Sequence, residues 1–158
     1  MRKKLGYIAL SAALLAVVSG LAVAQATTRT ISSPETIVLQ NNTTKSSDVN
    51  VGAKAWGPGD SFLNLGKLFD ETGVTPMGNS HIQCTVMPGK GWMLCNAALF
   101  IDGRGEIVLQ GAIKGTASTT SFDIPIVGGT GDFANVRGYD HVVSTDPTHE
   151  TDTLYLLP

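Results

Sequence analysis

Three kinds of residue are scarce in this chain of 158 residues: charged residues make up 15%, histidine occurs three times and cysteine twice. Beyond the first four positions, the basic residues are spread singly from Arg29 to Arg137. They form no basic stripe, which argues against a nucleic-acid-binding protein. Two cysteines without a nearby histidine cluster make a poor zinc site, so no metal is expected. The hydrophobic content of 42% is that of an ordinary globular protein, and the length indicates one domain.

The first 26 residues have the pattern of a secretory signal peptide. Arg2, Lys3 and Lys4 precede an uncharged run that ends in small residues. We predict cleavage of this leader, secretion to the extracellular space or the periplasm, and no membrane insertion of the mature chain; a membrane anchor is the weaker alternative. The leader holds three of the 11 bases and none of the 13 acids, so 8 bases and 13 acids remain, a net charge of −5.

No long stretch of the mature chain has the apolar period of a helix, and the 16 of the 18 glycines that follow the leader separate short apolar runs instead. Short turn sequences such as Pro88–Gly91 and Asp102–Gly105 join successive runs, which makes neighbouring strands antiparallel. Closure of the sheet removes exposed edges and is favoured over a sandwich. The sequence therefore predicts an all-β fold, an eight-stranded antiparallel up-and-down β-barrel with room for one small ligand. The predicted strands are Thr36–Gln40, a less certain Val49–Trp56, Ser61–Phe69, His81–Met87, Trp92–Ile101, Glu106–Ile113, Thr119–Val127, Val136–Ser144 and Thr151–Leu157.

The two cysteines test the register of one predicted hairpin. If its turn is centred between Gly89 and Lys90, Cys84 faces Cys95. Opposed residues of antiparallel strands have Cβ atoms roughly 4.5–5.5 Å apart, which allows a bridge, and secretion supplies oxidising conditions. We predict a Cys84–Cys95 disulfide, with a free reactive thiol or a metal pair as the alternatives.

The next hairpin, centred between Gly103 and Arg104, is predicted to pair Phe100 with Ile107. Every residue of Ala97–Ile101 is apolar, which is typical of a strand buried on both faces. One face can line the barrel, but the other would be exposed unless a second subunit covers it. We therefore expect a homo-oligomer.

The most specific stretch is Pro125–Tyr139, with the sequence PIVGGTGDFANVRGY. It is not a phosphate-binding loop, because it lacks Gly-Lys-Ser/Thr and a following helix, and the chain lacks the βαβ unit of a dinucleotide site. We interpret its glycines as permitting positive φ in a tight corner, with Phe133 packed beneath, and Arg137 as a structural residue that pairs with an acid such as Asp132. The residues of this structural motif are Gly128, Gly129, Thr130, Gly131, Phe133, Arg137 and Gly138.

This stretch closely resembles the signature of the dirigent and allene oxide cyclase superfamily, with Val136 where the family usually has alanine. Cys84 and Cys95 also resemble the cysteine pair of the bacterial members. The resemblance implies an eight-stranded antiparallel barrel with an apolar cavity, usually a trimer. It divides the chain into a signal peptide (1–26), a flexible arm with the first strand or strands (27–58) and a barrel core (59–158). Other segments that resemble the family are Gly59–Phe62, Leu68–Asp70, Met77–Gly78 and Val108–Gly111.

The resemblance also implies a function of one kind. A barrel without metal or redox cofactor holds a hydrophobic or phenolic reactive intermediate in one conformation while it couples or cyclises. Dirigent proteins orient phenoxy radicals that a separate oxidase makes, and allene oxide cyclases are isomerases that fold an epoxide before ring closure. Enforcing one conformer lowers the entropic part of one barrier, and roughly a few kcal/mol between competing barriers suffices for strong stereoselectivity.

The candidate catalytic residues lie on the predicted strands on either side of the signature. Asp123 is the first candidate for a cavity carboxylate, against the alternative of a solvated acid at a strand end. Tyr139 and His141 share the parity of Arg137, so the three side chains point the same way, onto either a polar lining or the outer surface. The chain lacks the paired acids that plant dirigents carry in the strand matching Phe62–Leu68, so the plant chemistry does not transfer residue by residue.

Three functions remain open at this point. The first is a dirigent-like guide or cyclase. The second is a carrier of an apolar small molecule, similar to a lipocalin, which a lining without acids would favour. The third is a cell-envelope structural or interaction module, which a cavity too small for a ligand would favour.

Overall fold

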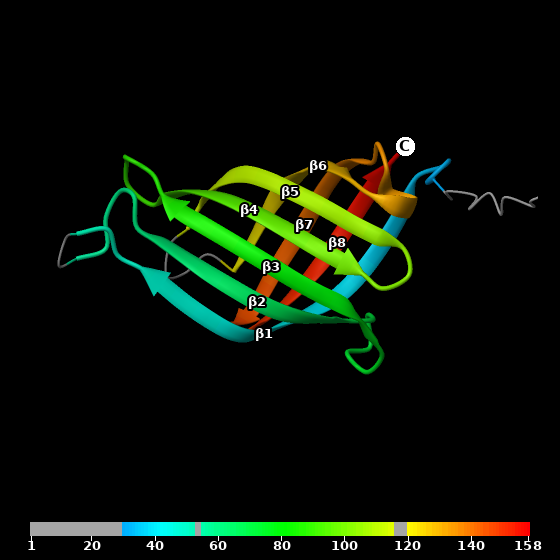
Figure 1. The fold of residues 1–158 in the computed structure, drawn as a ribbon, viewed down its shortest axis with the longest axis horizontal. Coiled ribbons are helices and arrows are strands. Elements are labelled where there is room, and N and C mark those ends of the chain that lie inside the picture. The colour runs from blue at the N-terminus through cyan, green and yellow to red at the C-terminus, as the bar shows by residue number, and fades with distance from the viewer. Residues whose placement is uncertain (1–29, 53–54, 116–119) are drawn as a thin grey trace, which may run out of the picture.

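Eight antiparallel strands form one closed barrel in a computed structural model, which describes residues 30–52, 55–115 and 120–158 (Figure 1). Each strand pairs with its neighbour in the sequence, and the first strand pairs with the last. The predicted fold class is therefore confirmed. The elements are β1 (Glu35–Val49), β2 (Ser61–Phe69), β3 (Pro76–Val86), β4 (Trp92–Ile101), β5 (Gly105–Lys114), β6 (Ser121–Gly129), the 3-10 turn η1 (Gly131–Phe133), β7 (Arg137–Asp146) and β8 (His149–Leu157).

The predicted signal peptide lies outside the described residues. Within the part of the chain that the structure describes, no helix has the length and apolar character needed to cross a bilayer.

The first strand is longer than the predicted Thr36–Gln40, because β1 closes the barrel. Glu35 to Asn42 pair with β8 and Gln40 to Val49 pair with β2, and a β-bulge between Thr43 and Lys45 interrupts the pairing with β2. A strand that must reach both neighbours in a strongly coiled sheet needs this length and this local twist.

A further strand over Val49–Trp56 was predicted, but beyond Val49 the described residues of this stretch form a loop. The buried carboxylate of Asp60 accepts hydrogen bonds from the backbone N–H groups of Val51 and Gly57, at 2.8 Å each. Because a side chain satisfies these donors, the loop does not need a neighbouring strand to do so.

The β3–β4 hairpin has the predicted register, with Cys84 opposite Cys95. The β4–β5 hairpin is shifted by one residue from our prediction: Ile107 faces Leu99, and Phe100 faces Glu106. Its turn takes three residues, with Gly103 at φ 73° and the Arg104 N–H bonded to the Ile101 carbonyl at 3.0 Å. The odd loop length places Leu99 and Ile107 together inside the barrel and leaves Phe100 on the outer face.

Cys84 and Cys95 form a disulfide, as predicted. Replacing both with alanine is expected to lower the free energy of unfolding by about 2–3 kcal/mol, because the cross-link restricts the unfolded chain. Urea unfolding of the double variant beside the oxidised wild type measures this difference through the midpoint. A change below about 0.5 kcal/mol would contradict a stabilising role for the bridge.

One end of the barrel is filled by the turn that follows β6. Phe133 has no exposed surface and packs with buried residues such as Val136 and Leu156. Gly129 is required here, since a Cβ at this position would lie 2.4 Å from the Glu106 carbonyl oxygen and 2.8 Å from the Phe133 Cβ. This closed end leaves the space inside the barrel to the opposite half.

The ion pair at this corner differs from our interpretation. The cation beside Asp132 is Arg104, with Nε 3.4 Å from the carboxylate, and not Arg137. Arg104 also pairs with Glu35 at 2.8 Å, and its guanidinium lies 4.7 Å from the centre of the Phe133 ring. The β4–β5 turn thereby joins the start of β1 to the corner, whereas Arg137 is exposed on β7.

Candidate functional site

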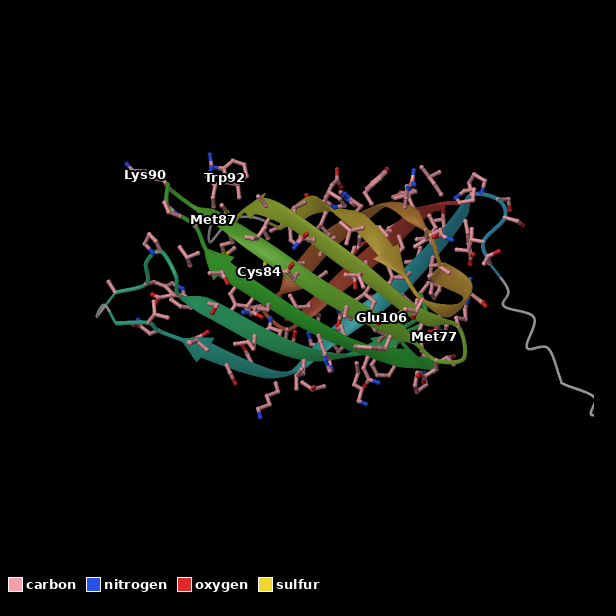
Figure 2. The ribbon with its side chains drawn as sticks, turned by 45° about the horizontal axis from the view of Figure 1, so that its top comes forward. Met77, Cys84, Met87, Lys90, Trp92 and Glu106 are labelled. Atoms are coloured by element: carbon pink, nitrogen blue, oxygen red, sulfur yellow. A yellow bond between two sulfur atoms is a disulfide. The ribbon has the colours of Figure 1, made fainter. Side chains whose placement is uncertain are left out.

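A cavity of about 490 Å³ occupies the half of the barrel opposite η1. It extends from the middle of the barrel to the β7–β8 turn, where Asp146, Pro147 and Thr148 line it. Figure 2 shows Cys84 on β3 between the β3–β4 turn, marked by Lys90 and Trp92, and the opposite end, marked by Met77 and Glu106. The disulfide thus lies in the cavity wall.

Most of the cavity wall is apolar. Inward-facing side chains alternate with outward-facing ones along each strand, so β2 to β6 each contribute residues of one parity. The apolar lining consists of Phe62, Ile82, Cys84, Met93, Cys95, Ala97, Leu99, Leu109, Ile113, Phe122, Ile124 and Val142.

The remaining wall, formed by β7, β8 and β1, carries four acids; Asp146 is exposed at the β7–β8 turn, and the other three are buried or partly buried. Asp140 comes from β7, and Glu150 and Asp152 come from β8. Asp140 and Asp152 are each only 2% exposed, and Glu150 is partly buried. We call these three residues the acid cluster.

Asn41 on β1 organises part of the acid cluster. Its Nδ2 donates to the Glu150 Oε1 at 2.9 Å and to the Asp152 Oδ2 at 3.2 Å. Its Oδ1 accepts a hydrogen bond from the Ser80 hydroxyl at 2.7 Å, which fixes the orientation of the amide. Both amide hydrogens therefore point to carboxylates, and the Oδ1 atom of Asp140 has no hydrogen-bond partner in the described structure.

Burial changes the ionisation of the acid cluster. Desolvation, followed by the charge of Glu150, raises the pKa of Asp140 to about 7. Desolvation also raises the pKa of Glu150 to about 7. The pKa of Asp152 is raised well above its usual value by desolvation and by the charges of Asp140 and Glu150. Near neutral pH the cavity therefore holds carboxyl groups that can either give or take a proton.

The structure places the predicted catalytic residues away from this cavity. Asp123, Tyr139 and His141 lie on the outer face of β6 and β7 and do not line the cavity. The Asp123 Oδ1 and His141 Nδ1 atoms are 2.6 Å apart on that face, and the Tyr139 ring stacks on Tyr155 with centroids 4.8 Å apart. A catalytic role for these three residues stays a prediction.

The sequence contained a signal for the acid cluster that our reasoning missed. Glu150 and Asp152 have the same parity on β8 as Leu154 and Leu156, which any alternating pattern would place inside. Asp140 has the opposite parity to Tyr139 and His141, so it faces inward where they face outward.

Together, these features define a small closed barrel with an apolar cavity and one acidic wall. No protein-family model and no curated protein sequence matches the chain. Among solved structures the chain is similar to pyocyanin demethylase, at a TM-score of 0.68 and 23% identity over 78% of this chain and 100% of that one. It is also similar to the pterocarpan synthase dirigent protein GePTS1, at a TM-score of 0.63 and 17% identity over 78% and 86% of the two chains.

A third similar structure is AbnU, an exo-specific intermolecular Diels–Alderase, at a TM-score of 0.60 and 13% identity over 78% of this chain and 98% of that one. These likenesses confirm the resemblance at the level of the fold: the chain has the barrel fold of dirigent and allene oxide cyclase-like proteins.

Proposed function

We propose that this protein binds a hydrophobic or phenolic reactive intermediate in its cavity and steers the coupling or cyclisation of that intermediate. The observation that supports this most is the acid cluster, Asp140, Glu150 and Asp152, in one wall of a cavity that β3, β4 and β5 line with apolar side chains. An apolar wall on one side and acids on the other give a ligand one preferred orientation.

The size of the cavity supports ligand binding over a purely structural role. About 490 Å³ falls within the range of small-molecule sites, which runs from roughly 300 to 1,000 Å³. A barrel that served only as an interaction module would gain stability by filling this space with side chains.

The acids support a reactive role over simple carriage. Burying carboxyls costs stability, and a carrier of apolar molecules gains nothing from that cost. A carboxyl whose pKa is near neutral can protonate a developing oxyanion or stabilise a developing cation as bonds form. The similar structures named as a dirigent protein and a Diels–Alderase support coupling or ring closure, although the one named as a demethylase shows that the fold alone does not set the reaction.

We further infer that the barrel acts outside the cytoplasm, after cleavage of residues 1–26, and as a homo-oligomer, with a trimer as the form that the family resemblance implies. The disulfide supports an oxidising compartment. Exposed apolar side chains on the outer face of β4, Leu94 and Phe100 at 38% each, support a contact with a second copy.

The test of steering is the handedness of a product. Alkenylphenols that bind the protein in calorimetry would be coupled by a one-electron chemical oxidant, and the products separated by chiral chromatography. We expect an excess of one enantiomer with the protein and a racemate without it; a tenfold ratio requires about 1.4 kcal/mol between the competing barriers. Racemic products from every phenol that binds would contradict the proposal.

Removing charge from the acid cluster is expected to reduce that excess. The double variant Asp140→Asn/Asp152→Asn keeps the size of both side chains but cannot donate or accept a proton, so we expect the enantiomer ratio to fall by about tenfold or to vanish. Binding of the neutral phenol should change by less than about threefold, since the apolar wall is untouched. Asp102→Asn, on the exposed β4–β5 turn at the closed end, is the control and should keep the wild-type ratio.

A further inference from the structure

The described residues that line the cavity contain many hydrogen-bond acceptors and almost no cation. Neither lysine nor arginine is among these lining residues. The one lining residue that can become cationic is His149, at the β7–β8 turn, and its Nδ1 is already 2.9 Å from the Asp146 Oδ2. Asn41 is the neighbour that donates to the acid cluster from a side chain.

Asp140 has the least satisfied carboxyl group of this wall. The residue is 2% exposed and lines the cavity, and its Oδ1 has no hydrogen-bond partner in the described structure. An unpartnered carboxylate oxygen in an apolar setting is unfavourable by more than an ordinary hydrogen bond is worth. The Oδ1 atom itself has almost no exposed surface, so a ligand acts on it through charge: a cation against this wall stabilises the charged form of Asp140.

On this basis we propose that the natural ligand carries a cationic nitrogen, a protonated amine or an N-alkylated aromatic ring, on a flat apolar body. The inference rests on the proposed function, since it names the class of molecule that the same cavity holds. The nitrogen lies against the acid cluster, and the body packs on the apolar part of the lining, where Phe62, Ile82 and Phe122 supply apolar and aromatic surface.

The same arrangement discriminates against anions. A carboxylate or phosphate placed in this cavity meets four acids, the acid cluster and Asp146, and no lysine or arginine among the described lining residues. Like charges in a site of low dielectric repel strongly, so fatty acids and other anionic ligands should be rejected. A neutral alcohol can donate one hydrogen bond to Asp140 but gains no charge interaction.

Cation binding must be coupled to ionisation of the acid cluster. The cation favours the charged form of each carboxyl and so lowers its pKa, which releases protons to the buffer near neutral pH. Raising the pH should therefore strengthen binding of the cation. The titratable groups around Asp140 are Glu150 and Asp152 on β8, Asp123 on the outer face of β6, and Asp146 and His149 at the β7–β8 turn.

The experiment uses three probes with the same aromatic body: naphthylmethylamine, naphthylmethanol and naphthoate, which are cationic, neutral and anionic. Affinities are measured by isothermal titration calorimetry on the full barrel from pH 5 to 8. At pH 8 we expect the amine to bind at least about tenfold more tightly than the alcohol, and naphthoate to bind at least about tenfold more weakly. At pH 5 the amine and the alcohol should differ by less than about threefold, since the three carboxyls of the acid cluster are then protonated and Asp146, which stays charged, is paired with His149.

Two further measurements, proton release on binding and the effect of one substitution, test whether the acid cluster causes the preference for the amine. Repeating the titration near pH 6.5 in buffers of different ionisation enthalpy should show that the amine releases up to about one proton and the alcohol none. Asp140→Asn should weaken binding of the amine by about tenfold at pH 8 and leave binding of the alcohol unchanged. Asp102→Asn should change neither, because this exposed residue lies at the closed end.

The outcomes separate the two proposals. If the alcohol binds as tightly as the amine at pH 8, or Asp140→Asn affects both equally, the cation inference is overturned while ligand binding in the cavity stands. If none of the three probes binds, both proposals are contradicted. Preference for the amine that persists at pH 5 would overturn the role of the acid cluster, since its carboxyls are neutral there.

Discussion

The folded protein is expected to lose stability as the pH rises from about 4 to 8, whereas proteins ordinarily lose stability as the pH falls into the acidic range. The carboxyls of Asp140 and Glu150 have pKa values raised to about 7 in the folded state, from ordinary values of 3.8 and 4.5, and the pKa of Asp152 is also raised. Between these limits the folded state binds more protons than the unfolded state, so the free energy of unfolding falls with rising pH. For a carboxyl shifted from 3.8 to about 7, the loss is on the order of 4 kcal/mol.

Two exposed acids act in the other direction but at lower pH. Hydrogen bonds, the largest from Thr72, hold the pKa of Asp70 well below its usual range, and hydrogen bonds to Thr148 and His149 do the same for Asp146. Their contribution to the free energy of unfolding is fully present above the ordinary carboxyl pKa and is lost only below about pH 4. Maximal stability is therefore expected near pH 4–5.

Urea unfolding followed at each pH measures this profile. The double variant Asp140→Asn/Asp152→Asn should be more stable than the wild type at pH 8 and should lose most of the slope, because these side chains no longer ionise. Asp102→Asn, an exposed acid on the β4–β5 turn, should keep the wild-type slope. A wild-type profile that is flat from pH 5 to 8 would show that the acid cluster is solvated in solution.

Phe133→Ala is expected to lower the free energy of unfolding by about 3–5 kcal/mol, which is typical of removing a fully buried phenylalanine. The Phe133 ring has no exposed surface and fills the closed end of the barrel, and it also supports the Arg104 guanidinium 4.7 Å from its centre. Its loss leaves a cavity that the backbone of the corner around Gly129 cannot collapse to fill.

Phe100→Ala is the matched control for this prediction. Phe100 lies on the outer face of β4, 38% exposed, and contacts His81 with ring centroids 5.2 Å apart. We expect a loss of about 1 kcal/mol for this variant, measured by urea unfolding at pH 5. Equal losses for the two variants would mean that Phe133 does not hold the closed end together.

The fold was largely predictable because it depends on local signals. Glycine-rich turns of fixed length and short alternating runs give antiparallel neighbours, and the bounds of β2 and β4 matched the prediction. The Cys84–Cys95 pairing followed from symmetry about one turn. The β4–β5 register did not, because a turn of three residues and one of four have similar glycine-rich sequences but shift the pairing by one residue.

The site was less predictable, because our reasoning looked for acids near the signature on the wrong parity. Asp123 and His141 are adjacent to inward-facing residues, yet they contact each other outside the barrel. The acid cluster comes from β7 and β8, and its partner Asn41 comes from β1, about 110 positions away in the sequence. No local pattern indicates that these strands close on each other.

The sequence by itself determined three features: the meander of antiparallel strands, the pairing of the two cysteines and the position of the glycine-rich corner. Each of these depends on residues close together in the chain. Only the tertiary structure decided that β1 closes the barrel against β8, that Phe133 and its neighbours fill one half and leave the other open, and that three carboxyls share one wall. These features arise from closure, which brings distant strands together and removes their side chains from water. The same burial then sets the ionisation of the acids.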